Sequence, residues 1–204
     1  MARDLLLASG NPHKASELSS SLAPIANISS PPSSLEVIED GKSFEENAFK
    51  KAHAYYKHFK HPAISDDSGI VVEALPEKLG IHSARFGGEG FTDRQRAQKL
   101  LNEMENKDNR KAFFVCILCF YLAPEEIFFF EGKLDGHISR EYSGAHGFGY
   151  DPVFIPLKGD GEKTLAQLPE WKAQNSHRSL ACRQAKRFLE SIESMESMVS
   201  PDRT

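Results

Sequence analysis

The sequence is poor in cysteine, with only Cys116, Cys119 and Cys182 among 204 residues. Three cysteines are too few for the disulfide framework of a small secreted domain, which excludes that class. Cys116 and Cys119 have the C-x-x-C spacing of some zinc and redox sites, but they lie in an apolar segment typical of a strand, where residues three apart point to opposite faces. Because no second cysteine pair accompanies them, we expect buried thiols, which suit the reducing cytoplasm.

Basic charge and long hydrophobic segments are also scarce. The 25 Lys and Arg residues are outnumbered by 29 Asp and Glu, for a net charge of −4, and this balance speaks against binding of nucleic-acid polymers. The longest apolar run, residues 112–123, is shorter than the ~20 residues that a transmembrane helix requires. The first residues lack an apolar stretch long enough for a signal peptide. We therefore expect a cytoplasmic protein that binds neither membranes nor nucleic-acid polymers.

The composition is that of an ordinary globular chain, 40% hydrophobic and 26% charged, and a chain of this size buries about 70% of its unfolded surface. Apolar segments predict strands at 5–8, 63–65, 112–122 and 127–131; residues 70–75 can continue the second of these, and residues 133–141 alternate weakly. Helical patterns predict helices at 14–22, 43–59, 92–106 and 179–198. Strands and helices interleave, but the two central strands follow each other as in a hairpin. We therefore expect an α/β fold with a mixed sheet, as a single domain over residues 1–204.

Two further expectations concern the shape of this domain. Segments 29–42 and 76–91 have the composition of linkers, and either can hinge a smaller lobe on the main sheet. Neither central strand alternates polar with apolar residues, so both are expected to be covered on both faces.

The first candidate site is Ser9-Gly10-Asn11-Pro12-His13-Lys14, which joins the first strand to a helix. Free N–H groups and the helix dipole favour an anion there. Gly10 permits close approach to the backbone, and Lys14 in the first turn can reach a phosphate. The segment lacks the Walker A pattern. A plain capped helix with a solvated lysine remains an equal alternative.

The second candidate is Asp66-Asp67-Ser68-Gly69, which we place at the end of a strand. Adjacent buried carboxylates repel each other, and Mg²⁺ bound through one or two of them together with substrate phosphates would compensate. One carboxylate can instead deprotonate a water, and an Asx turn is the structural alternative. Further acids and lysines flank the next helix, where acids also serve as caps: Glu36, Glu39, Asp40, Glu45, Glu46, Lys50 and Lys51.

The third candidate is Gly144-Ala145-His146-Gly147-Phe148-Gly149-Tyr150-Asp151-Pro152. Its glycines are in the wrong order for a dinucleotide fingerprint, and a strand follows instead of a helix. Aromatic side chains here can stack on a base and Asp151 can accept from a ring N–H, although a tight turn with core aromatics explains the pattern equally well. His177 and Arg178 before the last helix can donate to carbonyl or phosphate oxygens. Arg85 in Ser83-Ala84-Arg85 adds another cation or belongs to a surface turn.

In combination, these segments resemble the inosine triphosphate pyrophosphatase family. Six blocks occur in the family's order, and together they cover nearly the whole chain. They are Ser9-x-Asn11-x-x-Lys14-x-x-Glu17, Phe44-x-Glu46-Asn47-Ala48-x-x-Lys51-Ala52, Asp66-Asp67-Ser68-Gly69, Ser83-Ala84-Arg85, Gly147-Phe148-Gly149-Tyr150-Asp151-Pro152 and Ser176-His177-Arg178. Each block is weak alone, and their ordered combination is specific.

The resemblance implies Mg²⁺-dependent hydrolysis of ITP, dITP and XTP to the monophosphate and pyrophosphate. It also implies an elongated two-lobed fold with a central mixed sheet flanked by helices, the active site in the cleft between the lobes, and a homodimer. Asp67 would be the general base and a metal ligand, and Glu39 would be the second metal ligand, although the adjacent Asp40 is an alternative to Glu39. Lys14 and Lys51 would be the catalytic cations. The implied substrate contacts are Ser9, Gly10, Asn11, Pro12, His13, Lys14, Ser68, Phe148, Gly149, Tyr150, Asp151, Lys172, His177 and Arg178.

Two other readings stay open at this point. One is a related enzyme that hydrolyses modified pyrimidine nucleotides, and the other is a nucleotide-binding protein without catalysis. The intact Asp66-Asp67 pair and Lys14 favour an enzyme over the second of these.

Overall fold

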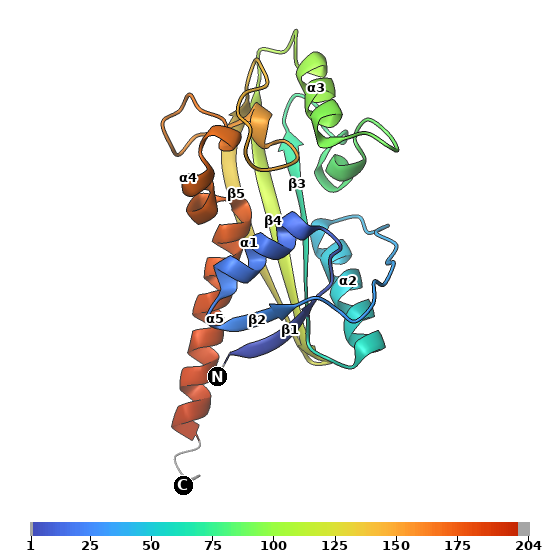
Figure 1. Ribbon diagram of the computed structural model, residues 1–204, viewed down its shortest axis with the longest axis vertical. Helices are drawn as coiled ribbons and strands as arrows, with labels where there is room; N and C mark the ends of the chain where they lie inside the picture. Colours follow the sequence, from blue (N-terminus) through green and yellow to red (C-terminus); the bar gives the residue numbers. More distant parts are fainter. Residues whose placement is uncertain (1, 200–204) are drawn as a thin grey trace.

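The computed structural model describes residues 2–199, and its centre is one six-stranded sheet in the order β2-β1-β3-β4-β5-β6 (Figure 1). The strands are β1 (Arg3–Leu7), β2 (Ala26–Ser29), β3 (Ala63–Val72), β4 (Lys111–Ala123), β5 (Glu126–Ile138) and β6 (Phe154–Pro156). β1 pairs in parallel with β2 and β3, whereas β3 to β6 pair antiparallel. The predicted mixed sheet is therefore confirmed.

Helices cover both faces of this sheet. They are α1 (Pro12–Leu22), α2 (Phe44–Phe59), α3 (Asp93–Glu103), α4 (Pro169–Asn175) and α5 (His177–Val199), with short 3₁₀ turns η1 (Gly80–Arg85), η2 (Asp151–Val153) and η3 (Leu165–Gln167). α2 packs on β3 and β4, while α5 packs on β4 and β5 with α1 beside it. Among residues 2–199, no helix is long and apolar enough to cross a membrane.

The side chains of β4 alternate between the two helical layers. Cys119 packs in the cluster under α2, whereas Cys116 packs with Cys182 of α5. All three cysteines are free and buried, and burial raises the pKa of each thiol. The prediction of buried, unpaired thiols on opposite strand faces is confirmed.

Polar caps set the helix starts. The Asn11 side chain accepts from the His13 and Lys14 N–H groups, and Thr92 forms a complete capping box with Gln95. Ser43 accepts from the Glu46 N–H at 3.1 Å. These caps fix the entry of α1, α2 and α3 by satisfying N–H groups that have no partner inside the helix.

Two strand predictions were wrong. β3 runs without a break from Ala63 to Val72, so Asp66 and Asp67 lie in the middle of a strand instead of at its end. β5 is longer than the strand predicted at 127–131, and it is not covered on both faces as predicted, because its Phe129 is 41% exposed. Helices cover β4 on both faces, as predicted. On the face where α2 packs, this helix lies on β3 and β4, and part of β5 is therefore exposed on that side.

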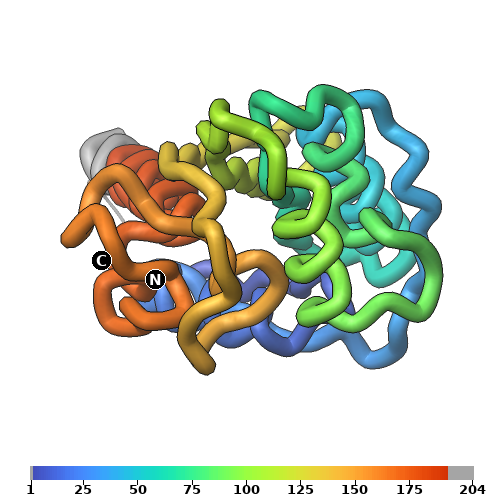
Figure 2. The backbone as a smooth tube through the Cα atoms, turned by 90° about the horizontal axis from the view of Figure 1, so that it is seen from above, coloured from blue at the N-terminus to red at the C-terminus, as the bar shows by residue number. Residues whose placement is uncertain are grey.

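The molecule is elongated and two-lobed, as predicted. β4 and β5 run along most of its length; α1, α2, β1 and β2 lie at one end, and α3 lies at the other (Figure 1). Viewed from above, α3 and the segment 140–170 lie on different sides of the sheet's upper end (Figure 2). Each end has its own apolar core, one built around Phe114, Leu100 and Phe154 and another around Leu5, Leu18 and Phe120.

Candidate active site

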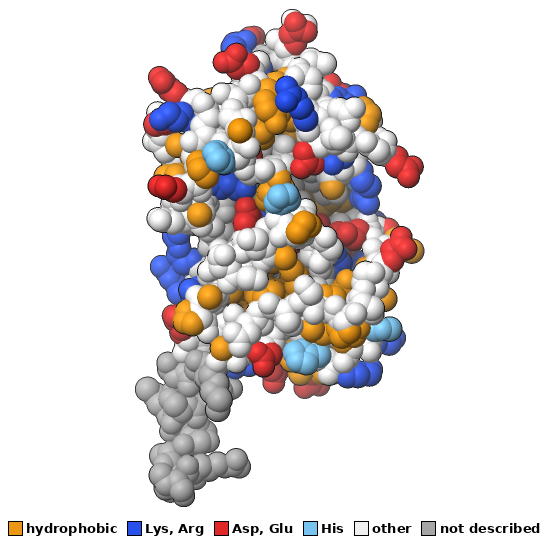
Figure 3. All heavy atoms as spheres, in the orientation of Figure 1, with side chains coloured by type: hydrophobic (Ala, Val, Ile, Leu, Met, Phe, Trp, Pro, Cys, Tyr) orange, Lys and Arg blue, Asp and Glu red, His pale blue; other side chains and the backbone are white. Residues whose placement is uncertain are grey.

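Two adjoining pockets lie where the lobes meet, and charged side chains of both signs gather across this level of the surface (Figure 3). The Asp67 pocket, of about 390 Å³, contains these predicted residues: Ser9, Gly10, Asn11, Lys14, Glu39, Lys51, Asp67 and Ser68. The Phe148 pocket, of about 190 Å³, contains these: Asn11, Lys14, Ser68, Phe148, Gly149, Tyr150, Asp151, Lys172, His177 and Arg178. Lys14 and Ser68 line both pockets. The fold thus brings five segments that are distant in the sequence to one place.

β3 directs its two aspartates to opposite sides, because consecutive side chains of a strand alternate. Asp67 lies on the side of α2, where its Oδ2 accepts from Asn47 Nδ2 at 3.3 Å. Asp66 lies on the side of α1 and α5, where it meets Lys14 and Arg178. The strand therefore separates the two carboxylates, and each has its own cations.

Asp66 is fully buried at the centre of an ionic network. Its Oδ2 lies 2.9 Å from Arg178 Nη2 and 3.1 Å from Lys14 Nζ, and it accepts from the Ser68 hydroxyl at 3.1 Å. Burial alone raises the pKa of Asp66, but the charges of Lys14 and Arg178 outweigh it and hold that pKa far below its usual range. The network fixes both cations at the wall of the Phe148 pocket.

Lys51 lies between two carboxylates of the Asp67 pocket. Its Nζ is 2.6 Å from Glu39 Oε2 and 3.3 Å from Asp67 Oδ1. Burial raises the pKa of Asp67 to about 6, against the opposing charges of Lys51 and Lys14. Burial tends to lower the pKa of Lys51, but the neighbouring carboxylates, led by Asp67, raise it overall.

The structure distinguishes Glu39 from its neighbour Asp40. Asp40 pairs with Lys50 at the surface, where 69% of its side chain is exposed, and Glu39 lines the Asp67 pocket. Within residues 2–199, no group of three or more His, Cys, Asp or Glu side chains could hold a metal. Mg²⁺ is commonly held by one or two carboxylates together with substrate phosphates. The pair of Glu39 and Asp67 fits that mode, and an all-protein cage is absent from the described residues.

The turn before α1 combines a helix cap with open space. Ser9 Oγ accepts from the Asn11 N–H at 3.2 Å, and Asn11 Oδ1 accepts from the His13 N–H at 2.9 Å. A Cβ added at Gly10 would meet no atom within 4 Å, so the backbone there faces free space in the pocket. Pro12 and His13 line neither pocket. The segment therefore caps α1 and still leaves room for the predicted anion site.

The glycine-rich loop is folded around Asp151. Asp151 Oδ2 accepts from the Phe148 N–H at 2.9 Å and from Lys172 Nζ at 2.7 Å. Gly147 has φ +77°, and a Cβ there would lie 2.1 Å from Asp151 Oδ2, so only glycine permits this approach. Burial raises the pKa of Asp151 in spite of the Lys172 charge. Asp151 therefore sets the position of the Phe148 ring.

Two aromatics of the loop have different surroundings. The Phe148 ring is stacked on His13 at 5.1 Å between centroids, and Lys172 Nζ lies over the same ring, 4.6 Å from its centroid. A base that stacks on Phe148 therefore uses ring surface that these two groups leave open, or replaces one of them. Tyr150 is buried in the upper core, and its hydroxyl donates to the Ser83 carbonyl at 2.7 Å. The phenol of Tyr150 thus ties the loop to η1, while its ring lines the Phe148 pocket.

The donors that face the Phe148 pocket are mostly occupied. Lys172 Nζ bonds Asp151 and Glu17, which leaves one of its three N–H donors. Arg178 uses four of its five donors on Asp66, Glu17 and Ser68, which again leaves one. Among residues 2–199, these two remaining donors have no protein acceptor assigned.

His177 differs from both cations. Its ring is stacked on Phe114 at 4.7 Å, and its Nδ1 is buried without a hydrogen-bond partner in the described part of the chain. Burial, and then the charges of Arg178 and Lys172, hold the pKa of His177 well below its usual value. His177 is therefore neutral near pH 7 and presents an unsatisfied polar atom in the lining of the pocket.

Sequence reasoning gave no role to Glu17 and Asn47, and it singled out Asp66 without predicting that it anchors cations. Glu17 bridges Lys172 and Arg178, Asn47 contacts Asp67, and Asp66 anchors Lys14 and Arg178. Glu17 and Asn47 lie inside the quoted motifs, so their presence there was the only available signal. Their partners come from other segments of the chain, which no local pattern reveals.

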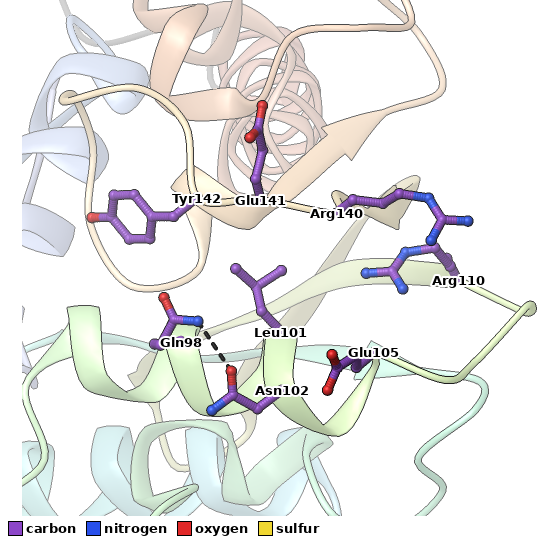
Figure 4. Close-up of a pocket in the computed structure, with 8 residues that line it drawn as sticks. All are labelled: Gln98, Leu101, Asn102, Glu105, Arg110, Arg140, Glu141 and Tyr142. Atoms are coloured by element: carbon purple, nitrogen blue, oxygen red, sulfur yellow. Dashed lines mark hydrogen bonds between the residues drawn. The ribbon is translucent and has the colours of Figure 1, made fainter.

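A further pocket of about 360 Å³ between α3 and residues 140–142 lies apart from these residues (Figure 4). Arg110 in its wall donates to the carbonyls of Met104, Ile138 and Ser139 at 2.6–2.7 Å. It therefore ties α3 to the end of β5. None of the predicted site residues lines this pocket.

Comparisons with known proteins agree with this geometry. The chain is 41% identical to a dITP/XTP pyrophosphatase of Aquifex aeolicus, over 93% of this chain and 98% of the relative. It is 37% identical to a dITP/XTP pyrophosphatase of Oceanobacillus iheyensis, over 93% and 100%. These names agree with the predicted family resemblance.

Solved structures give the same result. The Ham1 protein of Staphylococcus aureus superposes with a TM-score of 0.82 at 37% identity, covering 93% of this chain and 99% of that one. A HAM1 protein of Coxiella burnetii superposes with a TM-score of 0.83 at 32% identity, covering 94% and 100%. The family match itself spans residues 5–188. This chain therefore belongs to the Ham1 family.

Proposed function

We propose that this chain hydrolyses the non-canonical purine nucleotides ITP, dITP and XTP to the monophosphate and pyrophosphate. The junction of the two pockets at Lys14 and Ser68 carries the proposal. One pocket offers lysines and carboxylates, which suit a polyphosphate with a metal ion. The other offers an aromatic ring and unused donors, which suit a purine. The names of the bacterial relatives support the same substrate class.

Asp67 is proposed as the general base. Burial raises its pKa to about 6, so near pH 7 it is ionised yet close to the pKa that favours proton transfer. The oxygen of a water joins the α-phosphorus, the bond between that phosphorus and the α–β bridging oxygen breaks so that pyrophosphate leaves, and one proton of the water passes to Asp67. Lys14 and Lys51 offset negative charge on the phosphates.

Mg²⁺ is the proposed cofactor, with Glu39 and Asp67 as its ligands. When bound, it neutralises phosphate charge and polarises the phosphoryl oxygens. Lys51 lies between these two carboxylates in the described structure and holds them together, which keeps the donor pair assembled.

Base selection is proposed for the Phe148 pocket. Phe148 stacks on the base, while Asp151, Lys172, His177 and Arg178 face its edge. The single remaining donors of Lys172 and Arg178 match a 6-oxo group, which accepts two hydrogen bonds. Adenine presents an amino group at that position and leaves both donors unpaired, and discrimination of this kind reaches about 10⁴-fold.

A cytoplasmic, homodimeric, single-domain protein is proposed as the working form. Buried free thiols suit a reducing compartment, and a partner copy would cover the exposed Phe129. Light scattering tests the dimer, and Phe129→Asp should shift it toward monomer. A single cooperative unfolding transition tests the single domain.

The activity itself is tested by incubating ITP, dITP, XTP, GTP and ATP with Mg²⁺ and measuring pyrophosphate separately from orthophosphate. Pyrophosphate from the first three, with little from ATP, is the expected result. Orthophosphate, or equal rates with all bases, contradicts the proposal. A preference for modified pyrimidines would point to the pyrimidine alternative, and tight binding without turnover would point to a binding protein.

A further inference from the structure

Arg85 lines the Asp67 pocket from η1, a segment to which the proposed function assigns no role. Its side chain is exposed, and its Nη1 reaches the backbone carbonyl of Glu39 at 3.4 Å. Arg85 therefore spans from the upper lobe to the loop that carries one of the proposed metal ligands.

The backbone that carries Arg85 is firmly docked on β3. Ser83 Oγ accepts from the Ile70 N–H at 3.0 Å and lies 2.6 Å from the Gly80 carbonyl oxygen. A Cβ at Gly69 would lie 2.3 Å from that same carbonyl oxygen, so η1 approaches the strand as closely as glycine allows. Phe86, the next residue after Arg85, is buried. The exposed guanidinium is thus carried on a fixed backbone and lines the same pocket as Asp67 and Ser68.

The charge of Arg85 has no partner of opposite sign among the side chains that the structure describes. Lys14 pairs with Asp66, and Lys51 pairs with Glu39 and Asp67. Within residues 2–199, Arg85 has no carboxylate partner, and its two hydrogen bonds, to Glu39 O and His82 Nδ1, are both 3.4 Å long. Such long bonds are weak and are readily exchanged for an anionic ligand.

The position of Arg85 indicates which part of a nucleotide it meets. Asn11, Lys14, Ser68 and Ala84 line both pockets and mark the proposed junction between base and phosphates, whereas Arg85, the residue after Ala84, lines the Asp67 pocket alone. If the base of a nucleoside triphosphate lies in the Phe148 pocket, its last two phosphates extend into the Asp67 pocket, which Arg85 lines. An arginine fork can bind two phosphate oxygens at once.

We propose that Arg85 binds the two distal phosphates of the substrate, the pair that leaves as pyrophosphate. The proposal rests on the proposed function, because it assumes that the Phe148 pocket takes the base. It adds a substrate-binding residue from the upper lobe to the cations supplied by α1 and α2.

The test is calorimetric titration of inorganic pyrophosphate and of inosine monophosphate, each with Mg²⁺, into the wild type and variants. Arg85→Ala should weaken pyrophosphate binding about 10- to 100-fold, the range expected for lost hydrogen bonds to a charged group. Binding of inosine monophosphate should stay within about twofold. Arg85→Lys should give an intermediate pyrophosphate affinity, since it keeps the charge without the fork.

Arg94→Ala is the matched control. Arg94 lies on α3 in the same lobe, packs over Tyr142 and lines neither pocket, so its removal should leave both affinities unchanged. Thermal melting of each variant checks that the fold is intact, as expected for exposed side chains.

An unchanged pyrophosphate affinity in Arg85→Ala overturns the proposal, as does an equal loss for both ligands or the absence of pyrophosphate binding in the wild type. Failure of the proposed function gives a different result. A wild type that binds pyrophosphate but does not hydrolyse ITP refutes the proposed activity. The pyrophosphate affinities of the Arg85 variants then still test whether Arg85 binds phosphates.

Discussion

The guanidinium of Arg178 donates to the carboxylate of Asp66 at 2.9 Å, although 112 positions separate the two residues and both are buried. Removing one partner of a buried pair leaves an uncompensated charge in a poorly solvated place. This ion pair also joins β3 to α5, so it links the middle of the sheet to the last helix.

Asp66→Asn should therefore destabilise the fold by ~3–5 kcal/mol. The pKa of Asp66 is held far below its unfolded value, so its contribution to stability is fully present above about pH 4 and is lost as the pH falls toward the folded pKa. Urea unfolding at several pH values should show wild type and variant converging in acid. Asp135→Asn, at an exposed acid, is the control and should change stability little; a similar effect of both variants would refute the role of Asp66.

Asp67→Asn should lower turnover by about 10²- to 10⁴-fold, because an amide cannot take the proton from water. Pyrophosphate release from ITP measures the rate, and circular dichroism checks the fold. Asp40→Asn is the matched control at an exposed acid, which pairs with Lys50 outside the pocket, and it should retain wild-type turnover. Near-normal rates in Asp67→Asn would remove this residue as the base.

The requirement for Mg²⁺ should depend on pH. Because burial raises the pKa of Asp67 to about 6, protons compete with the metal below that pH. The Mg²⁺ concentration for half-maximal activity should rise about tenfold per pH unit below pH 6 and level off above it. Metal titrations between pH 5 and 8 provide the measurement, and a requirement that stays constant over this range would contradict the assignment of Asp67 as a ligand.

Glu17→Gln should weaken base selection, since Glu17 bonds both Lys172 and Arg178. Gln keeps the size of the side chain but not the charge that holds the two cations in place. We expect the KM for ITP to rise and the ITP-over-ATP preference to fall about tenfold, with kcat for ITP little changed. Ser16→Ala, an exposed position on the same helix, is the control, and an unchanged preference in Glu17→Gln would show that Glu17 does not position the donors.

The main elements were predictable because their signals are local. Thr92 with Gln95 marks the start of α3, and the apolar run of β4 is evident in the sequence. The middle of β3 was not predictable, because Asp66-Asp67-Ser68-Gly69 has the chemistry of a turn. What keeps it extended is its pairing with β4 and the cations of α1, α2 and α5, and these act across the fold.

In the candidate site, too, local signals were predictable and contacts between distant segments were not. Its residue types were visible as motifs, and most of the predicted residues line the two pockets. Which carboxylate meets which cation was not visible, because Lys51 and Arg178 reach β3 from different faces. The choice of Glu39 over Asp40 likewise depends on how the loop before α2 turns, which short-range patterns do not specify.

Asp66 and Asp67 are neighbours in one strand that pairs with β4 along its whole length. No hinge can therefore lie between Asp66, which anchors Lys14 and Arg178, and Asp67, the group proposed to accept the proton. Any closure of the lobes carries both aspartates as one rigid body together with η1, which is docked on the same strand, and leaves the Glu39 loop as the segment that moves relative to them. The anchor of the two cations, the proposed proton acceptor and the proposed ligand of the distal phosphates are therefore all mounted on one strand and the turn docked on it.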